Sequence, residues 1–170
     1  MGKQMAGKSS DTGNLTLSGR FNHYSSIYLG FAARAFARRN SRVYTASGGT
    51  RGNMLQGKPV FQLIVTGRKS GEPRPVMLML IRDGDDLLVC GSNGGHPGTP
   101  NWWHNLAARP TAEVRVGPDT WPVDVRIVAD DEEYEKHWRT LAAAYPDFDT
   151  YRALSPRKFP MAVLSRATAK

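Results

Sequence analysis

The fold of this chain is decided by the stretch Val76-Met77-Leu78-Met79-Leu80-Ile81-Arg82-Asp83-Gly84-Asp85-Asp86-Leu87-Leu88-Val89-Cys90. A continuous apolar run over residues 76–81 is followed by turn-forming residues at 83–86 and by a second apolar run at 87–90. An Asp-Gly pair between two apolar runs is a strong signal for a β-hairpin. The stretch therefore predicts two strands that pair with each other around a tight turn.

Further strand patterns lie on both sides of this hairpin. In residues 61–66 the apolar Phe61, Leu63 and Val65 alternate with Gln62, Ile64 and Thr66, and residues 67–74 then form a turn. Residues 112–116 and 121–128 are expected to pair around Gly117-Pro118-Asp119, and residues 159–164 provide a last strand. Five or six strands in meander order with few helices favour a mainly β (α+β) fold, built as a small antiparallel barrel.

Two helices are expected between these strands. Residues 101–108 form a short helix that ends before Pro110. A second helix begins with Asp130 and Glu133 at the spacing of a capping box and continues to about Tyr145.

The N-terminal third differs from the rest of the chain in charge. Residues 1–51 hold eight cations and one anion, whereas residues 52–170 hold 15 cations and 14 anions. We expect a disordered basic tail over residues 1–19, a helix (about 22–40) with a Gly-rich linker over residues 20–58, and a barrel domain over residues 59–170. The helix packs across the body or lies on anionic lipid, and both alternatives stay open. The nearly neutral body argues against a nucleic-acid partner.

The composition excludes several kinds of site. Cys90 is the single cysteine, so a disulfide framework and a cysteine-built metal site are excluded. The four histidines are scattered, and no metal site is expected. No segment is apolar and long enough to span a bilayer, and a secretory signal is missing. We therefore expect a cytoplasmic protein, with peripheral attachment to the inner face of the cell membrane as the open alternative.

Three segments contain the residue types that ligand chemistry needs. Residues 67–74 gather three cations, a hydroxyl and two glycines at one turn, which suits either an anion site or a solvated hairpin tip. Residues 90–98 form a Gly-rich loop after a strand, and Trp102 and Asn105 follow it on the short helix. Residues 145–151 gather aromatic side chains where a helix ends. These residues suit a pocket with a tyrosine as proton donor, or simple core packing.

Taken together, these segments resemble the deazaflavin (F420)-dependent nitroreductase and quinone reductase family of actinobacteria. Order and spacing hold from about Val60 to Val163. The matching segments are Gly67-Arg68-Lys69-Ser70-Gly71-Glu72-Pro73-Arg74, Ile81-Arg82-Asp83-Gly84, Gly91-Ser92-Asn93-Gly94-Gly95, Pro100-Asn101-Trp102 with Asn105-Leu106, Ala108-Arg109-Pro110, and Tyr145-Pro146.

The resemblance implies a split β-barrel of the FMN-binding, flavin-reductase type that uses reduced coenzyme F420 as hydride donor. Tyr145 and Ser92 are the implied catalytic residues, because either the tyrosine or a water beside the serine supplies the proton. The residues implied in coenzyme binding are Arg68, Lys69, Ser70, Gly71, Arg74, Met77, Gly91, Ser92, Asn93, Asn101, Trp102 and Asn105. The residues implied in the acceptor pocket are Met79, Tyr145, Phe148 and Tyr151.

The acceptor side departs from the best-studied nitroreductase branch. Met79, Asn93 and Phe148 stand where that branch has tyrosine, lysine and tyrosine. An apolar Met79 and Phe148 suggest an apolar electrophile, such as a quinone, an activated enone or a nitro compound. The alternatives are an FMN-dependent oxidoreductase on the same barrel and a non-catalytic carrier of a lipid or tetrapyrrole. The sequence leaves the oligomeric state open.

Overall fold

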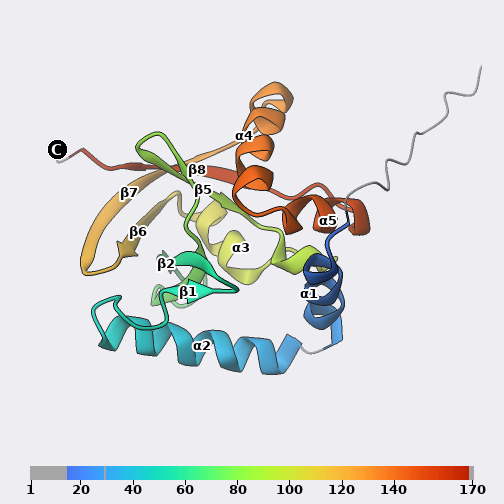
Figure 1. Cartoon of the computed structure of the whole chain (residues 1–170). Helices are drawn as coiled ribbons and strands as arrows, with labels where there is room; N and C mark the ends of the chain where they lie inside the picture. The colour runs from blue at the N-terminus through green and yellow to red at the C-terminus, as the bar shows by residue number, and fades with distance from the viewer. Residues whose placement is uncertain (1–14, 29, 169–170) are drawn as a thin grey trace, which may run out of the picture.

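A computed structural model of the chain describes residues 15–28 and 30–168, without the side chains of residues 26–36. One curled sheet occupies the centre, and helices cover it (Figure 1). The strands are β1 (Met54–Leu55), β2 (Lys58–Thr66), β3 (Pro73–Met79), β4 (Arg82–Asp83), β5 (Asp86–Cys90), β6 (Thr111–Val116), β7 (Asp119–Ile127) and β8 (Met161–Arg166). The helices are α1 (Leu17–Tyr28), α2 (Gly30–Ala46), α3 (Asn101–Ala108), α4 (Asp131–Ala144) and α5 (Asp147–Leu154), with a 3-10 turn, η1 (Asn93–Gly95).

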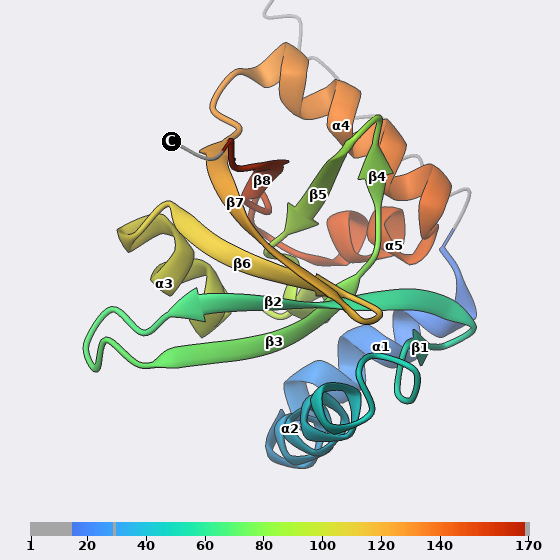
Figure 2. The same ribbon diagram turned by 90° about the vertical axis from the view of Figure 1, so that its left-hand side faces the viewer.

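The sheet is antiparallel throughout and has the strand order β1-β2-β6-β7-β8-β5-β4, with β3 also paired to β2. The strands bend around a common interior in Figure 2. This is the predicted split β-barrel with flanking helices. The predicted meander order is wrong, because β6 pairs with β2 and β5 pairs with β8, so strands far apart in the chain lie side by side.

The predicted hairpin over residues 76–90 needs correction. The turn at Gly84 is present, but it joins β5 to the two-residue strand β4. The strand β3 pairs with β2 instead, from Val60 opposite Met79 to Thr66 opposite Pro73. The chain changes neighbour after β3, because Leu80 donates its N–H to the Pro59 carbonyl, whereas the Ile81 carbonyl accepts from β5. One apolar run thus serves two pairs of strands, which its sequence pattern does not reveal.

Two clusters of buried side chains lie on opposite faces of the sheet. Along β5, Leu87 and Val89 point into the first cluster, and Leu88 points into the second. The strand β8 alternates in the same way. Strands buried on both faces read as continuous apolar runs, which is the pattern of both segments. Trp103 and Leu106 of α3 join the first cluster, and α4 and α5 supply most aromatic rings of the second.

The helices α3 and α4 were predicted from the sequence, whereas α5 was not. The predicted helix over residues 101–108 is α3, and the Asp130 side chain caps α4 by accepting the Glu133 N–H at 2.8 Å. The helix α5 was not expected, because residues 145–151 were interpreted as an aromatic cluster at a helix end.

The N-terminal segment contains two helices where one was expected over residues 22–40. The first begins earlier, because the Thr16 side chain accepts the Gly19 N–H at 3.0 Å and so caps α1. Residues 1–14 of the predicted disordered tail lie outside the described residues, and residues 17–19 belong to α1. The helix α2 packs along the barrel through Tyr44, which is fully buried and accepts the Gly117 N–H at 2.8 Å.

No helix within residues 15–28 and 30–168 is long and apolar enough to cross a membrane.

Candidate functional site

The turn between β2 and β3, residues Gly67–Arg74, is closed by its own backbone and is called the cationic turn below. Gly67 donates its N–H to the Glu72 carbonyl, and Gly71 donates to the Gly67 carbonyl, both at 2.8 Å. Gly71 adopts the left-handed conformation with φ of 73°. A Cβ atom on Gly67 would lie 2.7 Å from the Ser70 hydroxyl and 3.2 Å from the Glu72 carbonyl oxygen, so a larger residue there would require the Ser70 side chain to move.

The three cations of this turn outnumber its single carboxylate, Glu72, and do not pair with it. Arg68, Lys69 and Arg74 are all exposed, and among the described residues none forms an ion pair with a carboxylate. The Arg74 guanidinium donates to the Ser70 hydroxyl at 3.2 Å. Arginine and lysine side chains without a carboxylate partner can bind an anionic ligand without first breaking an ion pair.

The helix α3 holds the cationic turn through one amide. The Asn105 side-chain oxygen accepts from the Arg68 guanidinium at 2.8 Å and from the Arg68 N–H at 3.3 Å. Asn101 and Trp102 lie within one turn of Asn105 on α3, so the three share a side of the helix. Asn101 is exposed, and Trp102 is half-buried against the first core cluster. The predicted coenzyme residues of the turn and of α3 are therefore neighbours.

The loop that follows β5, residues Gly91–Gly98, is called the glycine loop below. Asn93, Gly94 and Gly95 have successive positive φ angles of 54°, 64° and 80°. A Cβ atom on Gly95 would lie 3.4 Å from Tyr151, so the glycine loop packs directly on α5. Ser92 is buried at the start of this loop. The loop therefore brings the residues implied in coenzyme binding at its start next to the residues implied in the acceptor pocket.

The four predicted acceptor residues belong to one cluster, the acceptor cluster. The rings of Tyr145, Phe148 and Tyr151 lie 5.7 to 6.4 Å apart, measured between centroids. All three are at least nine-tenths buried, and Met79 packs against the same cluster. Met77 lies two positions earlier on β3 and so points to the same face of the sheet as Met79. The sequence therefore selected residues that the fold does bring together.

The Tyr145 hydroxyl is held by residues that the sequence analysis missed. It donates to the Gln56 side-chain oxygen at 2.5 Å, accepts from the Asn22 amide at 3.2 Å and lies 3.4 Å from the Tyr151 hydroxyl. Burial raises the pKa of Tyr145 well above its usual value, and the neighbouring Tyr151 raises it further. Tyr145 is thus a neutral phenol that can donate a hydrogen bond. No motif marks Asn22 or Gln56, because each is a lone amide in the segment expected to be helix and linker.

A buried carboxylate attaches α1 to this cluster. The Asp147 side chain is 3% exposed and accepts hydrogen bonds from Thr16, from Ser18 at 2.7 Å and from Asn22 at 3.2 Å. Burial alone would raise the pKa of Asp147, but these hydrogen bonds outweigh it and lower the pKa. Because Asn22 contacts both Asp147 and Tyr145, the docking of α1 and the position of the phenol are coupled.

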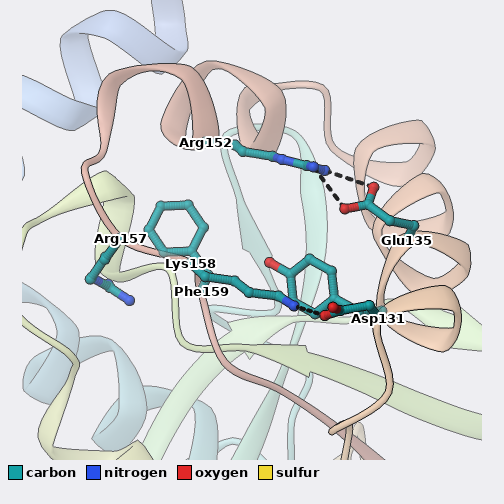
Figure 3. Close-up of a pocket in the computed structure, with 7 residues that line it drawn as sticks. Asp131, Glu135, Arg152, Arg157, Lys158 and Phe159 are labelled. Carbon is teal, nitrogen blue, oxygen red and sulfur yellow. Dashed lines mark hydrogen bonds and ion pairs between the residues drawn. The ribbon is translucent and has the colours of Figure 1, made fainter.

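A separate hollow of about 480 Å³ opens between α4, α5 and the segment before β8 (Figure 3). Four of its charged side chains form two ion pairs, Arg152 with Glu135 at 2.7 Å and Lys158 with Asp131 at 2.5 Å, and Arg157 is a further cation of its lining. None of the predicted site residues lines it. The hollow therefore shares no residue with the predicted coenzyme and acceptor sites.

Two other kinds of chemistry find no support. Burial raises the pKa of Cys90 to about 12, so its thiol stays protonated and is a poor nucleophile at neutral pH. The described His, Cys, Asp and Glu side chains form no group of three that could hold a metal ion.

Comparisons with known proteins cover most of the chain. A family model described as F420H(2)-dependent quinone reductase matches residues 36–166. An F420H(2)-dependent quinone reductase of Mycobacterium tuberculosis is 33% identical over 132 residues, which are 76% of this chain and 89% of that protein.

Two solved structures are similar to this chain in both fold and sequence. An F420-H2 dependent reductase (FDR-A) is 30% identical with a TM-score of 0.58, over 63% of this chain and 94% of the other. A chain described as a domain-swapped dimer is 29% identical with a TM-score of 0.61, over 75% of this chain and 96% of the other.

Proposed function

Because the chain belongs to the F420H(2)-dependent quinone reductase family, we propose that it passes a hydride from reduced coenzyme F420 to an apolar, electrophilic acceptor of the quinone class. The protein is an F420-dependent reductase, and reduced coenzyme F420 is its cofactor. The family, fold class and cofactor expected from the sequence are thereby confirmed, whereas the acceptor and the role of each residue are proposals.

The observation that carries the proposal is the set of unpaired cations in the cationic turn. Lys69 and Arg74 would bind the phosphate and acidic tail of the coenzyme by charge-assisted hydrogen bonds, which are stronger than neutral ones. Arg68 would contribute its remaining N–H groups while Asn105 fixes its direction. The glycines keep the turn compact, so that its backbone can approach the phosphate closely.

The ring side of the coenzyme would lie against α3 and the glycine loop. When bound, the coenzyme supplies a hydride, and the protein must hold donor and acceptor within contact distance. Trp102 offers an aromatic face, Asn101 offers an amide, and the backbone at Gly91 approaches without a side chain. A Cβ atom on Gly91 would lie 3.0 Å from the Pro160 ring, so that position requires glycine or a shift of Pro160.

Tyr145 would deliver the proton that follows the hydride, or stabilise the oxyanion that a quinone becomes. Its hydroxyl already donates to Gln56, so an acceptor must replace that hydrogen bond. Ser92, with a neighbouring water, is the second proton source. Met79, Phe148 and Tyr151 give this side an apolar lining, which favours an apolar acceptor.

We also propose that α1 touches the inner face of the cell membrane. Leu17, Phe21 and Tyr24 lie on one side of α1 and are 83%, 71% and 50% exposed. Arg20 is exposed on the same helix, and Arg42 is exposed on α2. An exposed apolar helix face beside cations suits an anionic lipid surface, where apolar quinones are dissolved.

The coenzyme site is tested by two substitutions in the cationic turn. Lys69→Ala and Arg74→Ala each remove a charge-assisted contact worth about 1.5–3 kcal/mol, so each weakens coenzyme affinity about tenfold to a hundredfold in equilibrium titrations. Added salt weakens the wild type as well. Arg139→Ala, which removes an exposed cation on α4, leaves affinity unchanged. Unchanged affinity in both turn variants would exclude the cationic turn as the anion site.

A further inference from the structure

Arg157 lies in the segment between α5 and β8, and its guanidinium group reaches back to the glycine loop. Its Nε atom donates to the His96 carbonyl at 3.0 Å. Its Nη2 atom contacts the carbonyl oxygens of Gly91 and Ser92, both at 2.9 Å, and of Gly98 at 3.4 Å. One side chain therefore forms hydrogen bonds with both the start and the end of the glycine loop.

The glycine loop needs such a tie. Three successive residues, Asn93 to Gly95, have left-handed backbone conformations, and Asn93 pays a steric cost that glycine avoids. Within the loop, Gly95 donates to the Ser92 carbonyl at 3.0 Å and His96 donates to the Asn93 carbonyl at 3.2 Å. The Gly98 N–H donates to the His96 ring at 2.8 Å, and the Asn93 side chain donates to the Gly98 carbonyl at 3.1 Å. The guanidinium adds contacts to the carbonyl groups at both ends of this segment, from outside the loop.

The charge of Arg157 is not neutralised by the protein. No carboxylate of the described residues forms an ion pair with it. The titratable groups that act on it are Cys90 and Tyr134, and burial raises the pKa of each to about 12, so both are neutral at pH 7. Its Nη1 atom is buried and has no hydrogen-bond partner within the described part of the chain.

Arg157 is half-buried, and removing part of an unpaired cation from water has a cost unless something offsets it. The Phe159 ring, whose centroid lies 4.6 Å from the guanidinium carbon, offsets part of this cost. A ligand that carries extra electron density beside the glycine loop would offset more. The reduced coenzyme is more electron-rich than the oxidised form, and charge near the ring nitrogens tunes such cofactors.

We propose that Arg157 is the positioning residue of the coenzyme's ring site: it fixes the glycine loop, and its unpaired charge makes the site favour the reduced coenzyme over the oxidised one. This inference rests on the proposed function. It assigns a role to a residue outside the predicted site, on a segment that no motif marks.

The test is the ratio of the affinities for reduced and oxidised coenzyme F420, measured by anaerobic equilibrium titration of the full chain. Arg157→Gln removes the charge, so the preference for the reduced form falls about tenfold. That change lowers the midpoint potential of the bound two-electron couple by about 30 mV. Arg157→Lys keeps the charge but loses the planar fork, so both forms bind more weakly and the ratio stays near that of the wild type.

Hydrogen exchange of the coenzyme-free protein provides a second readout. Amides of the glycine loop exchange faster in both Arg157 variants, because the tie between the two ends is weakened. Arg152→Gln is the matched control: Arg152 is exposed on α5 and pairs with Glu135, so neither the ratio nor the loop exchange changes.

The outcomes separate this inference from the proposed function. A ratio unchanged in Arg157→Gln overturns the inference, as does loop exchange as slow as in the wild type. If Arg157→Gln does not fold, the Arg157→Lys variant provides the test. A loss of the preference for the reduced coenzyme in Arg157→Lys, which keeps the charge, also overturns the inference. A wild-type protein that binds neither form of the coenzyme refutes the proposed function itself.

Discussion

At the scale of single residues, the contacts of Tyr145 join the acceptor cluster to the N-terminal segment. Its hydroxyl contacts Gln56 from the β1–β2 turn and Asn22 from α1, although the ring itself lies in the barrel's second core cluster. The amides of Asn22 and Gln56 also bond each other, at 2.8 Å and 3.2 Å. The pair therefore orients the phenol from outside the motif segments that the sequence analysis named.

Substitution of Tyr145 separates chemistry from binding. Tyr145→Phe keeps the ring but removes the hydroxyl, so turnover slows about 10–1000-fold while coenzyme affinity changes little. Because the pKa of Tyr145 is raised, the wild-type hydroxyl keeps its proton throughout neutral and mildly alkaline pH. Single-turnover kinetics measure the chemical step directly.

Two further variants control for packing at this site. Phe148→Leu changes the shape of the cluster without removing a hydroxyl, and Tyr151→Phe removes the neighbouring hydroxyl at 3.4 Å. If Tyr145→Phe turns over acceptor at the wild-type rate, with chemistry rate-limiting, Tyr145 is only a wall of the pocket. Water beside Ser92 then becomes the better proton source.

At the scale of elements, the attachment of α1 depends on Asp147. Asp147→Asn turns an acceptor-only group into an amide that presents N–H atoms to three donors. We expect the variant to lose about 1–3 kcal/mol of stability and to expose α1 to protease, as measured by thermal unfolding and limited proteolysis. Asp124→Asn, at an exposed position on β7, is the control. Unchanged protection of α1 in Asp147→Asn would contradict the docking role.

The same carboxylate predicts an acid dependence of α1 docking. The pKa of Asp147 is lower in the folded protein than the usual value of 3.8. The folded state therefore binds this proton less well than the unfolded state does. The contribution of Asp147 is complete above about pH 4 and is lost as pH falls through the folded pKa.

The exposed face of α1 predicts vesicle binding that depends on two side chains. Leu17→Gln with Phe21→Gln removes the most exposed apolar groups of α1, so binding to anionic vesicles in a flotation assay falls at least tenfold. Ile127→Gln is the control, because Ile127 is 41% exposed on β7, away from α1. A wild-type protein that ignores such vesicles at low salt would contradict the membrane proposal.

In the molecule as a whole, local structure could be predicted from the sequence, whereas the pairing of the strands could not. The helix α3 and the Asp130 cap follow from neighbouring residues, and both are present as expected. The pairing of β3 depends on where the chain changes partner between Leu80 and Ile81, and no local pattern records that change. The helix α5 was missed because its first residues, Asp147 and Phe148, were interpreted through their aromatic neighbours alone.

The residues of the candidate site likewise fall into those that could be predicted from the sequence and those that could not. Segments with several chemistry-bearing residues in sequence, such as the cationic turn, were recognisable, and the fold brings Arg68 next to Asn105. Single residues that act from distant segments left no signal. Asn22, Gln56 and Arg157 are a helix amide, a turn amide and an isolated arginine, and the tertiary fold alone gives them their partners.

We propose above that this barrel uses reduced coenzyme F420 to reduce a quinone-type acceptor. The most direct test mixes the purified full chain with reduced coenzyme and a panel of quinones, enones and nitro compounds under anaerobic conditions. Return of the oxidised coenzyme's absorbance is then followed in a stopped-flow instrument. We expect catalytic reoxidation, fastest with apolar quinones and slower in Lys69→Ala. A chain that is purified with bound FMN, or that gives no reoxidation with any acceptor, would contradict this proposal.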